Sequence, residues 1–416
     1  MTVKSLGIIA DDLTGALDTG VQFSKWGLAS VVTLTDSLQS HVACIVINTD
    51  SRALPVREAE ERVRRAARLL RGRLVYKKID STLRGNVGAE LAVAMAELEA
   101  RKAVFVPGFP ANGRTTVGGR LLVRGVPLEQ TGIGRDPRNA IKESYVPNLL
   151  QAQMHEPIGL VDIKVVEQGP EAIMAAVAAT LERVVVVDAA TEAHLAAIAQ
   201  AVLRSQGAWL PVGSAGLAEG LAPALGLSKN GGRFSGWPPA QGPLLVIAGS
   251  RNDVTAAQLR EAMASLELGV VEPEVQRLVA EDSIERADEA ARVAAAAGQF
   301  LAAGRPTLVT ACFASVIAGG ALPIALGMGE ITSRIMVEHP VGGLFLTGGD
   351  IAFQVCRALG GEALRPLTEI VPGLPASLLS GGAWDGLRIV TKAGGFGEKD
   401  AIVVGCHYII GETKHG

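Results

Sequence analysis

Two adjacent carboxylates follow the first apolar stretch of the chain, and their position points directly to chemistry. The run Leu6–Ala10 is apolar, and Asp11 and Asp12 come directly after it, before a turn of small residues. In an open α/β sheet, ligands bind in the crevice beyond the carboxyl ends of the strands. A dinucleotide-binding turn has glycines at this point, and two carboxylates would repel a pyrophosphate. The turn therefore suits sugar hydroxyls, a metal ion or a proton better than a cofactor phosphate.

Three further polar stretches each follow an apolar run that is predicted to be a strand. In chain order they are Thr49–Arg52, Lys77–Asn86 and Pro110–Thr116. The carboxyl ends of parallel strands meet at one edge of a sheet, so we expect these stretches to converge with Asp11 and Asp12.

The side chains in these stretches match a small acid that carries several hydroxyl groups. Arginine is especially suited to pair with a carboxylate through two parallel hydrogen bonds. The candidate carboxylate-binding residues are Arg52, Lys78 and Arg84. The candidate hydroxyl-binding residues are Asp11 or Asp12, Asp80 and Ser81.

Each of these residues also has a purely structural interpretation. Asp12 suits the N-cap of a helix that begins two residues later, and Asp80 or Ser81 suits the N-cap of the next helix. Arg52 and Arg84 could simply be solvated. Convergence of several clusters at one sheet edge favours a binding site over capping alone.

The second half of the chain has glycine turns after its predicted strands instead of acidic clusters. The three turns are Gly249–Asn252, Thr347–Ala352 and Lys392–Gly397. Glycines let backbone N–H groups approach phosphates, and the hydroxyls of Ser250 and Thr347 could add donors. Tight turns are the commoner use of glycine, but three such turns favour a nucleotide. The sequence contains no GxxxxGK[ST], so this is not a Walker-type site.

The composition of the 416 residues sets further limits. Hydrophobic residues make up 48% and aromatic residues 4%, which predicts a core of Ala, Val, Leu and Ile such as parallel strands form under helices. The net charge of −3 argues against nucleic acid as a partner. Four cysteines without CxxC spacing fit a reducing compartment, and we expect a cytoplasmic protein without a signal peptide.

The uncharged stretch Thr307–Gly329 is long enough to span a bilayer. It contains Pro323 and several glycines, and more Ala than Leu. We therefore expect a buried strand at Thr307–Cys312, a loop and a packed helix, and no membrane partner.

Apolar strand candidates alternate with helical patterns along the chain, which predicts an α/β fold of mainly parallel sheets flanked by helices. The segment 227–242 is rich in Gly, Pro and Ser and has no apolar periodicity. We expect a first domain at 1–228, a linker at 229–242 and a second domain at 243–416, with the active site in the cleft between the domains.

Together these motifs resemble the four-carbon acid sugar kinases, a family once known as a domain of unknown function. In the first half the matching motifs are IADDLTGALDTG, TDSR, KKIDSTLRGNVGAEL, PGFPANGRTTVGG and the Asp136-Pro137 pair. In the second half they are GSAGLA, AGSRNDVT, TGGDIA and KAGGFG. The resemblance covers nearly the whole chain in order. It departs at Arg251–Asp253, where relatives often have smaller residues, and at the apolar stretch Thr307–Gly329.

The resemblance implies an N-terminal domain that binds a sugar acid and a C-terminal domain that binds ATP. It implies ATP-dependent phosphorylation of the terminal hydroxyl of threonate or erythronate in sugar-acid catabolism, and the KIDS form of the third motif looks less like the 3-oxo-tetronate kinases. The residues implied for the sugar acid are Asp11, Asp12, Arg52, Lys78, Ile79, Asp80 and Ser81, and Arg84 joins them by its charge. Those implied for ATP are Ser250, Gly348, Gly349, Asp350, Gly394 and Gly395, with Thr347 beside them.

We expect direct in-line phosphoryl transfer, in which positioning and charge matter more than covalent chemistry. Asp12 is the first candidate for the base and Asp11 the second. Mg²⁺ would bridge the ATP phosphates; its protein ligands are open, although Asp350 is a candidate. The alternatives are a 3-oxo-tetronate 4-kinase, a sensor without catalysis, or an NAD-dependent oxidoreductase, for which a GxGxxG turn in the right context is missing. The stereoisomer stays open, and a homodimer is expected only because such enzymes are often symmetric.

Overall fold

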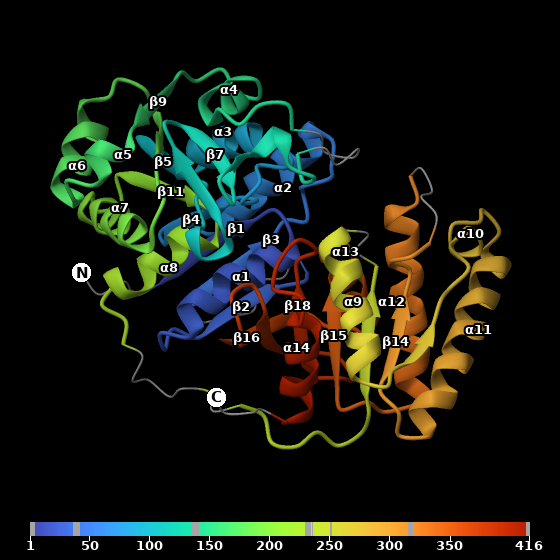
Figure 1. Cartoon of the computed structure of the whole chain (residues 1–416). Helices are drawn as coiled ribbons and strands as arrows, with labels where there is room; N and C mark the ends of the chain where they lie inside the picture. Colours follow the sequence, from blue (N-terminus) through green and yellow to red (C-terminus); the bar gives the residue numbers. More distant parts are fainter. Residues whose placement is uncertain are drawn as a thin grey trace. The chain divides into compact units, whose positions relative to one another are not determined.

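The structure is a computed structural model of the chain, and it describes residues 5–35, 42–134, 141–228, 234, 236–249, 252–314 and 319–412. The chain forms two compact units (Figure 1). Unit 1 comprises Met1–Val32 and Leu38–Arg233, and unit 2 comprises Thr33–Ser37 and Phe234–Gly416. Both units are α/β, which confirms the predicted fold class.

Unit 1 is built on a sheet with the strand order β2-β3-β1-β4-β11-β5-β10-β9. Its strands are β1 (Leu6–Ala10), β2 (Ser30–Thr33), β3 (Cys44–Asn48), β4 (Leu74–Lys78), β5 (Lys102–Val106), β9 (Ile158–Val161), β10 (Val184–Val187) and β11 (Trp209–Gly213). From β3 to β9 the neighbouring strands pair in parallel. Such strands are buried on both faces, which explains their nearly continuous apolar sequence.

Two groups of helices cover the sheet of unit 1. Helices α2, α3 and α4 pack together, while α1, α8, α7 and α6 pack in that order, on the other side of the strands (Figure 1). Their bounds are α1 (Leu13–Ser24), α2 (Val56–Leu69), α3 (Val87–Glu97), α4 (Val146–Gln151), α5 (Ile163–Val166), α6 (Pro170–Ala179), α7 (Glu192–Arg204) and α8 (Ala215–Ala224). Alternate strand residues point to opposite faces, so Ile9 and Ile45 join the core formed with Val63 of α2 and Leu91 of α3.

A small antiparallel sheet follows β5, and the sequence patterns did not predict it. It consists of β6 (Arg114–Val117), β7 (Arg120–Val123) and β8 (Val126–Pro127). Part of the predicted polar stretch Pro110–Thr116 is therefore strand. Gly118 and Gly119 turn the chain between β6 and β7 at φ of 59° and 71°, and the Asp188 carboxylate accepts both of their N–H groups.

Unit 2 contains a second sheet with the order β13-β14-β12-β15-β18-β17-β16. The strands are β12 (Leu244–Ala248), β13 (Gly269–Val271), β14 (Thr307–Thr310), β15 (Gly343–Thr347), β16 (Ala363–Glu369), β17 (Pro375–Ser380) and β18 (Arg388–Lys392). Pairing is parallel from β13 to β18 and antiparallel from β18 through β17 to β16. The antiparallel strands β16 and β17 were not predicted.

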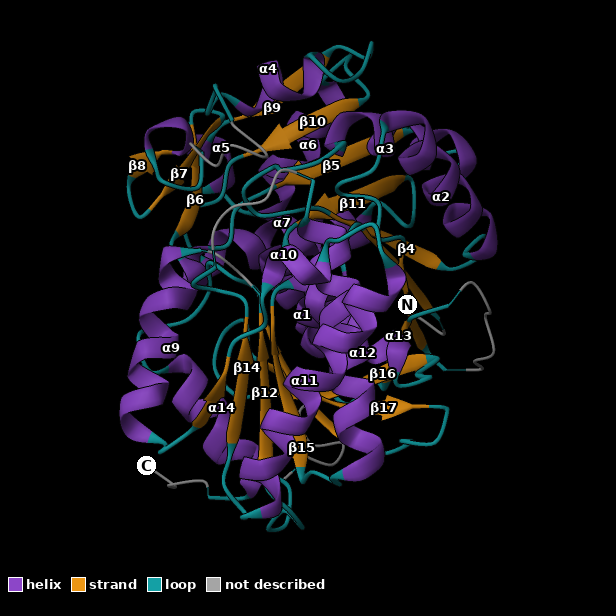
Figure 2. Ribbon diagram, turned by 90° about the vertical axis from the view of Figure 1, so that its right-hand side faces the viewer, coloured by secondary structure: helices purple, strands orange, loops and turns teal. Residues whose placement is uncertain are grey.

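Helices lie on both faces of this second sheet. Strands β14, β12 and β15 run between α9 and α14 on one side and α11, α12 and α13 on the other (Figure 2). The helices are α9 (Asp253–Ser265), α10 (Val275–Leu278), α11 (Ser283–Ala302), α12 (Ala321–Glu338), α13 (Gly349–Ala358) and α14 (Ala401–Ile410).

The uncharged stretch at 307–329 contains β14 and the first half of α12. Across the described ranges, we find no helix whose length and hydropathy would suffice to cross a bilayer.

Candidate active site

The parallel register of β1, β3 and β4 brings the predicted acidic and basic residues of unit 1 to one sheet edge. Ala10 is level with Asn48 of β3, and Ile9 is level with Lys77 of β4. The chain beyond β3 then folds back over β1, since the N–H groups of Ser51 and Arg52 both donate to the carbonyl of Asp11, at 2.9 and 3.2 Å. The side chains that follow these strands are thereby close neighbours.

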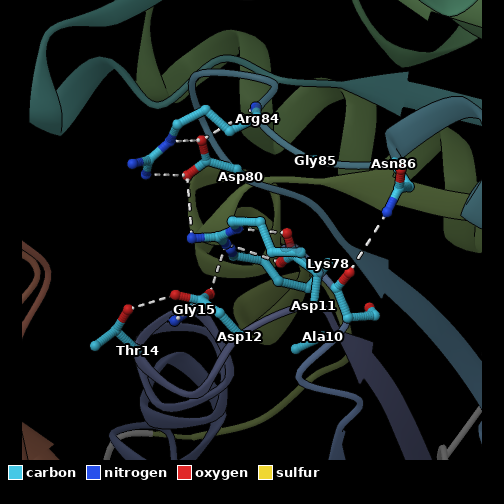
Figure 3. Close-up of polar contacts among 12 residues, drawn as sticks. Ala10, Asp11, Asp12, Thr14, Gly15, Lys78, Asp80, Arg84, Gly85 and Asn86 are labelled. Atoms are coloured by element: carbon cyan, nitrogen blue, oxygen red, sulfur yellow. Dashed lines mark hydrogen bonds and ion pairs between the residues drawn. The ribbon is translucent and has the colours of Figure 1, made fainter. Parts of the chain in front are cut away.

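Arg52 lies at the centre of this cluster and pairs with carboxylates of the chain itself. Its Nε donates to Asp11 Oδ2 at 2.7 Å and its Nη2 to Asp11 Oδ1 at 2.9 Å, a bidentate pair. Nη2 also donates to Asp12 Oδ1 at 2.6 Å, and Nη1 lies 3.8 Å from Asp80 Oδ1. Figure 3 shows the resulting network of carboxylates and cations. One guanidinium therefore holds three carboxylates in place.

Asp80 forms a second pair with Arg84. Arg84 Nε donates to Asp80 Oδ2 at 2.6 Å and Nη2 to Oδ1 at 3.0 Å (Figure 3). Thr82 Oγ1 also donates to Asp80 Oδ2. Asp80 and Ser81 do not cap the next helix, because α3 begins at Val87, after Asn86. The capping interpretation of Asp80 and Ser81 is therefore wrong, since the chain turns at Asp80 rather than starting a helix.

The arginines keep both buried aspartates ionised. Burial raises the pKa of the Asp80 carboxyl, but Arg84 and Arg52 outweigh it and hold the pKa well below the ordinary value of 3.8. Burial also raises the pKa of Asp11, but nearby positive charges outweigh it and leave this pKa lowered. These charges belong to Arg52, Lys78 and Lys77. Both carboxylates thus act as fixed negative charges rather than as proton carriers near neutral pH.

Asp12 is the more accessible member of the adjacent carboxylate pair. Its side chain is 13% exposed, against 5% for Asp11. It caps α1 by accepting the Gly15 N–H at 3.0 Å on Oδ1, and it accepts Thr14 Oγ1 at 2.7 Å on Oδ2. Capping therefore fixes the position of this carboxylate at the site, and the two interpretations of Asp12 are compatible.

Lys78 brings a buried ammonium group to the start of α1. The residue is 4% exposed, and within the described ranges its ammonium makes neither a hydrogen bond nor an ion pair. A Cβ atom built on Gly15 would lie 2.5 Å from Lys78 Nζ and 2.5 Å from Asp12 Oδ1, so a larger residue there would displace these two groups (Figure 3). Gly15 is a site residue that we did not predict, although it lies inside the first motif.

Lys77, the neighbour of Lys78, faces the other side of the sheet. Its ammonium pairs with Glu90 of α3 at 2.8 Å, and both side chains are almost completely buried. Ser51 Oγ donates to the same Glu90 at 2.6 Å and lies 2.8 Å from Thr49 Oγ1. This buried network fixes the loop that carries Arg52. Because successive side chains of a strand point to opposite faces, the sequence could have predicted that the two lysines face different sides of the sheet. That Glu90 is the partner of Lys77 is visible only in the structure.

Ile79 and Ser81 complete the sugar-acid residues implied by the resemblance. The Ile79 side chain is 1% exposed and packs in the core of unit 1, and its backbone N–H donates to the carbonyl of Gly213 at 2.9 Å. Ser81 is 4% exposed and lies in the turn between Asp80 and Arg84.

The predicted nucleotide residues of unit 2 follow β15 and β18. Gly348 has φ of 102° and immediately precedes α13, whose first residue is Gly349. Asp350 is exposed in the first turn of that helix. The Thr347 side chain is fully buried. Ser250 lies outside the described residues, as does the Asp136-Pro137 pair.

Gly394 and Gly395 lie in the half-buried loop that connects β18 to α14. In the part of the chain that the structure describes, no group of three or more His, Cys, Asp or Glu side chains is arranged to hold a metal ion.

Two family models match the chain in the same order as the two units. Residues 6–221 match a sugar-binding N-terminal domain, and residues 245–402 match a nucleotide-binding C-terminal domain. A sugar-binding domain followed by a nucleotide-binding domain places the chain in the class of sugar kinases.

Curated relatives narrow this class. The chain is 36% identical to a D-threonate kinase of Salmonella typhimurium over 97% of both chains, and 35% identical to a D-erythronate kinase of Heliobacterium modesticaldum over 98% of both. It is 29% identical to a 3-oxo-tetronate kinase of Methylobacterium radiotolerans, over 95% of this chain and 97% of the relative. The chain belongs to the four-carbon acid sugar kinase family and is a phosphotransferase.

A solved structure shares the fold. A protein of Salmonella typhimurium LT2, described as a putative tRNA synthase, superimposes with a TM-score of 0.79 over 96% of this chain and 98% of its own. At 24% identity this likeness establishes the fold alone.

Proposed function

We propose that this enzyme transfers the γ-phosphoryl group of ATP to the C4 hydroxyl of a four-carbon sugar acid, D-threonate or D-erythronate. The observation that carries the proposal is the buried Lys78 ammonium, which makes no hydrogen bond or ion pair in the described ranges and lies beside the capped carboxylate of Asp12. A buried ammonium needs polar partners, and the carboxylate of an acid substrate would add a direct ion pair to the field of Asp11 and Asp12. The names of the curated relatives support the same substrate class.

In this proposal Lys78 binds the carboxylate of the sugar acid, and the start of α1 adds its favourable dipole. Arg52 is paired with three carboxylates, so it orders the site and screens negative charge there. Arg84, whose side chain is 31% exposed, and Asp80 are placed to hydrogen-bond hydroxyls. Ser81 and the backbone of Ile79 line the same turn. A fixed array of donors and acceptors of this kind distinguishes hydroxyl positions by geometry.

Asp12 is proposed as the group that orients the C4 hydroxyl and accepts its proton during transfer. As the C4 oxygen bonds to the γ-phosphorus, the bond from that phosphorus to the β–γ bridging oxygen breaks and ADP leaves. Asp12 is preferred to Asp11 because it is more exposed, whereas both oxygens of Asp11 are engaged by the guanidinium of Arg52.

For the nucleotide we propose the turn Gly348–Asp350, the pair Gly394 and Gly395, and Ser250. Glycine at φ of 102° lets the chain enter α13 with its N–H groups directed at a ligand. Magnesium binds proteins through one or two carboxylates, while substrate phosphates and waters fill its other positions. The single exposed carboxylate of Asp350 is therefore sufficient for such a site. Bound there, Mg²⁺ would neutralise phosphate charge.

We also propose a cytoplasmic homodimer. Cys44, Cys312, Cys356 and Cys406 are all buried free thiols, which suits a reducing compartment. Exposed apolar side chains on α12, Leu322, Leu326 and Val337, are suited to contact a second copy. Sedimentation of the purified chain tests the dimer.

The experiment that tests the function is a coupled ADP-release assay with Mg-ATP against D- and L-threonate, D- and L-erythronate and 3-oxo-tetronates. Strong turnover with threonate or erythronate supports the proposal and identifies the isomer. Turnover confined to 3-oxo-tetronates would make the enzyme a 3-oxo-tetronate 4-kinase instead. No turnover with any acid of the panel, together with intact ATP binding, would favour a sensor that binds both ligands without phosphoryl transfer.

A further inference from the structure

Lys392, the last residue of β18, is fully buried and is surrounded by oxygen atoms of its own neighbourhood. Its Nζ lies 2.9 Å from the carbonyl oxygen of Ala393, 3.1 Å from that of Gly394 and 3.2 Å from that of Phe396. Thr255 Oγ1 is at 3.4 Å. Burial lowers the pKa of Lys392 to about 7, and the Cys312 thiol opposes this to a smaller degree. Carbonyl dipoles are the partners that a buried ammonium needs.

Helix α9 binds the same loop from a second direction. Thr255 Oγ1 donates to the Gly394 carbonyl at 2.8 Å. Gln258 Nε2 donates to three consecutive carbonyl oxygens, those of Phe396 at 3.0 Å, Gly397 at 3.1 Å and Glu398 at 2.7 Å. One ammonium, one hydroxyl and one amide therefore bind most of the carbonyl groups of the loop 393–398.

This arrangement determines the direction of the N–H groups. In a planar trans peptide the C=O and the following N–H point in opposite directions. Because Lys392 binds the carbonyls of Ala393 and Gly394, the N–H groups of Gly394 and Gly395 are directed away from it. Residues 393–397 are only half-buried. Successive N–H groups that face the same side form a concave site for anions.

We propose that Lys392 is a positioning residue for nucleotide binding: it holds the loop 393–398 so that the N–H groups of Gly394 and Gly395 bind phosphate oxygens of ATP or ADP. Lys392 does not touch the nucleotide itself. The identity of the anion rests on the proposed function. A lysine that only filled space in the core would affect stability without distinguishing phosphorylated from unphosphorylated ligands.

The test compares full-length wild type with Lys392→Met, which keeps the length of the side chain and removes the charge. The control is Val293→Ala in α11, a fully buried position that lies outside the glycine loop and α9. We measure the dissociation constants of ATP and ADP by calorimetry, the inhibition constant of adenosine and the melting temperature. Lys392→Met should weaken ATP and ADP binding about tenfold or more, because the loop loses the hydrogen bonds from Lys392 that hold its carbonyl groups, while adenosine binding changes little. Val293→Ala should lower only the melting temperature.

A milder variant keeps the test decisive if Lys392→Met does not fold. Thr255→Val preserves the shape of the side chain and removes the hydrogen bond to the Gly394 carbonyl, so it should weaken ADP about threefold, in proportion to one neutral hydrogen bond. Unchanged ADP affinity in the folded variants, or an equal loss of adenosine affinity, would overturn the proposal. Because ADP binding is measured directly, this test of Lys392 does not depend on turnover with any of the sugar acids.

Discussion

The two sheets of this enzyme present different chemistry at the carboxyl ends of their parallel strands. In unit 1, the edge formed by β1, β3 and β4 carries side-chain charges that pair with one another, with Arg52 between three carboxylates. In unit 2, the edge formed by β15 and β18 carries glycine turns whose backbone groups are held by a few buried side chains. Side chains can match the separate hydroxyls of a sugar acid, whereas backbone N–H groups suit phosphates, which are alike in every nucleotide.

Two lysines that end strands make the contrast concrete. Lys78 ends β4 and, in the described ranges, makes no hydrogen bond or ion pair, and we propose that its ammonium binds the sugar acid. Lys392 ends β18 and its ammonium is surrounded by four oxygens of the chain. The same residue type at the same place in a strand thus has different surroundings in the two units, and the sequence position alone does not distinguish them.

The largest effect should come from Asp12→Asn in unit 1. Asn caps helices about as well as Asp, so folding should be preserved, but the amide cannot accept the hydroxyl proton. We expect kcat to fall about 10²- to 10⁴-fold, with ATP affinity almost unchanged. The coupled ADP-release assay and calorimetry measure the two quantities. Normal turnover in a folded Asp12→Asn enzyme would refute the assignment of the base.

Lys78→Met tests whether the available ammonium binds the substrate acid. Loss of one charge-assisted hydrogen bond should raise KM for the sugar acid about 10- to 100-fold and leave the affinity for ADP unchanged, the reverse of the pattern expected for Lys392→Met. Lys78→Arg is the matched control, because it keeps the charge but not the geometry. A Lys78→Met enzyme that lost only nucleotide affinity would contradict the division of roles between the two units.

Gly348→Ala addresses the glycine turn before α13. At φ of 102° and ψ of 128° only glycine is relaxed, so alanine should cost about 1–3 kcal/mol of unfolding free energy. The affinity for ATP should fall as well, while that for the sugar acid stays constant. Denaturant unfolding gives the first value and calorimetry the others. Gly226→Ala, at φ of 75° with open space around the position, is a control for backbone strain without a ligand.

The smallest effect is expected at acid pH and comes from the aspartates of unit 1. The pKa of Asp80 in the folded enzyme is well below its ordinary value of 3.8. Its contribution to the unfolding free energy is therefore fully present above pH 3.8 and is lost as the pH falls from there toward the folded-state pKa. We expect the unfolding free energy to decline below pH of about 4, and less steeply in Asp80→Asn. Denaturant titrations between neutral and acid pH measure both slopes. Identical slopes for wild type and Asp80→Asn would show that the arginine partners do not lower the pKa of Asp80.

Much of the fold and site followed from the sequence because the determining signals are local. Apolar runs marked the parallel strands, and the residues directly after them, such as Asp11, Asp80 and Gly348, had to lie at the carboxyl edges of the sheets. The antiparallel strands β6–β8, β16 and β17 were missed because their segments carry no continuous apolar run and gain stability from their partners.

The sequence by itself determined the family, the order of the two domain types and the strand ends at which their polar residues gather, since these depend on residue type and spacing. Only the tertiary structure decided which charges pair. Lys77 and Lys78 are adjacent in sequence, yet one is neutralised by Glu90 and the other lies beside Gly15, because successive strand residues face opposite sides of the sheet. Likewise, folding brings Asp11 and Asp12 to Arg52, and Thr255 to Lys392, and such long-range contacts leave no signal in the local sequence.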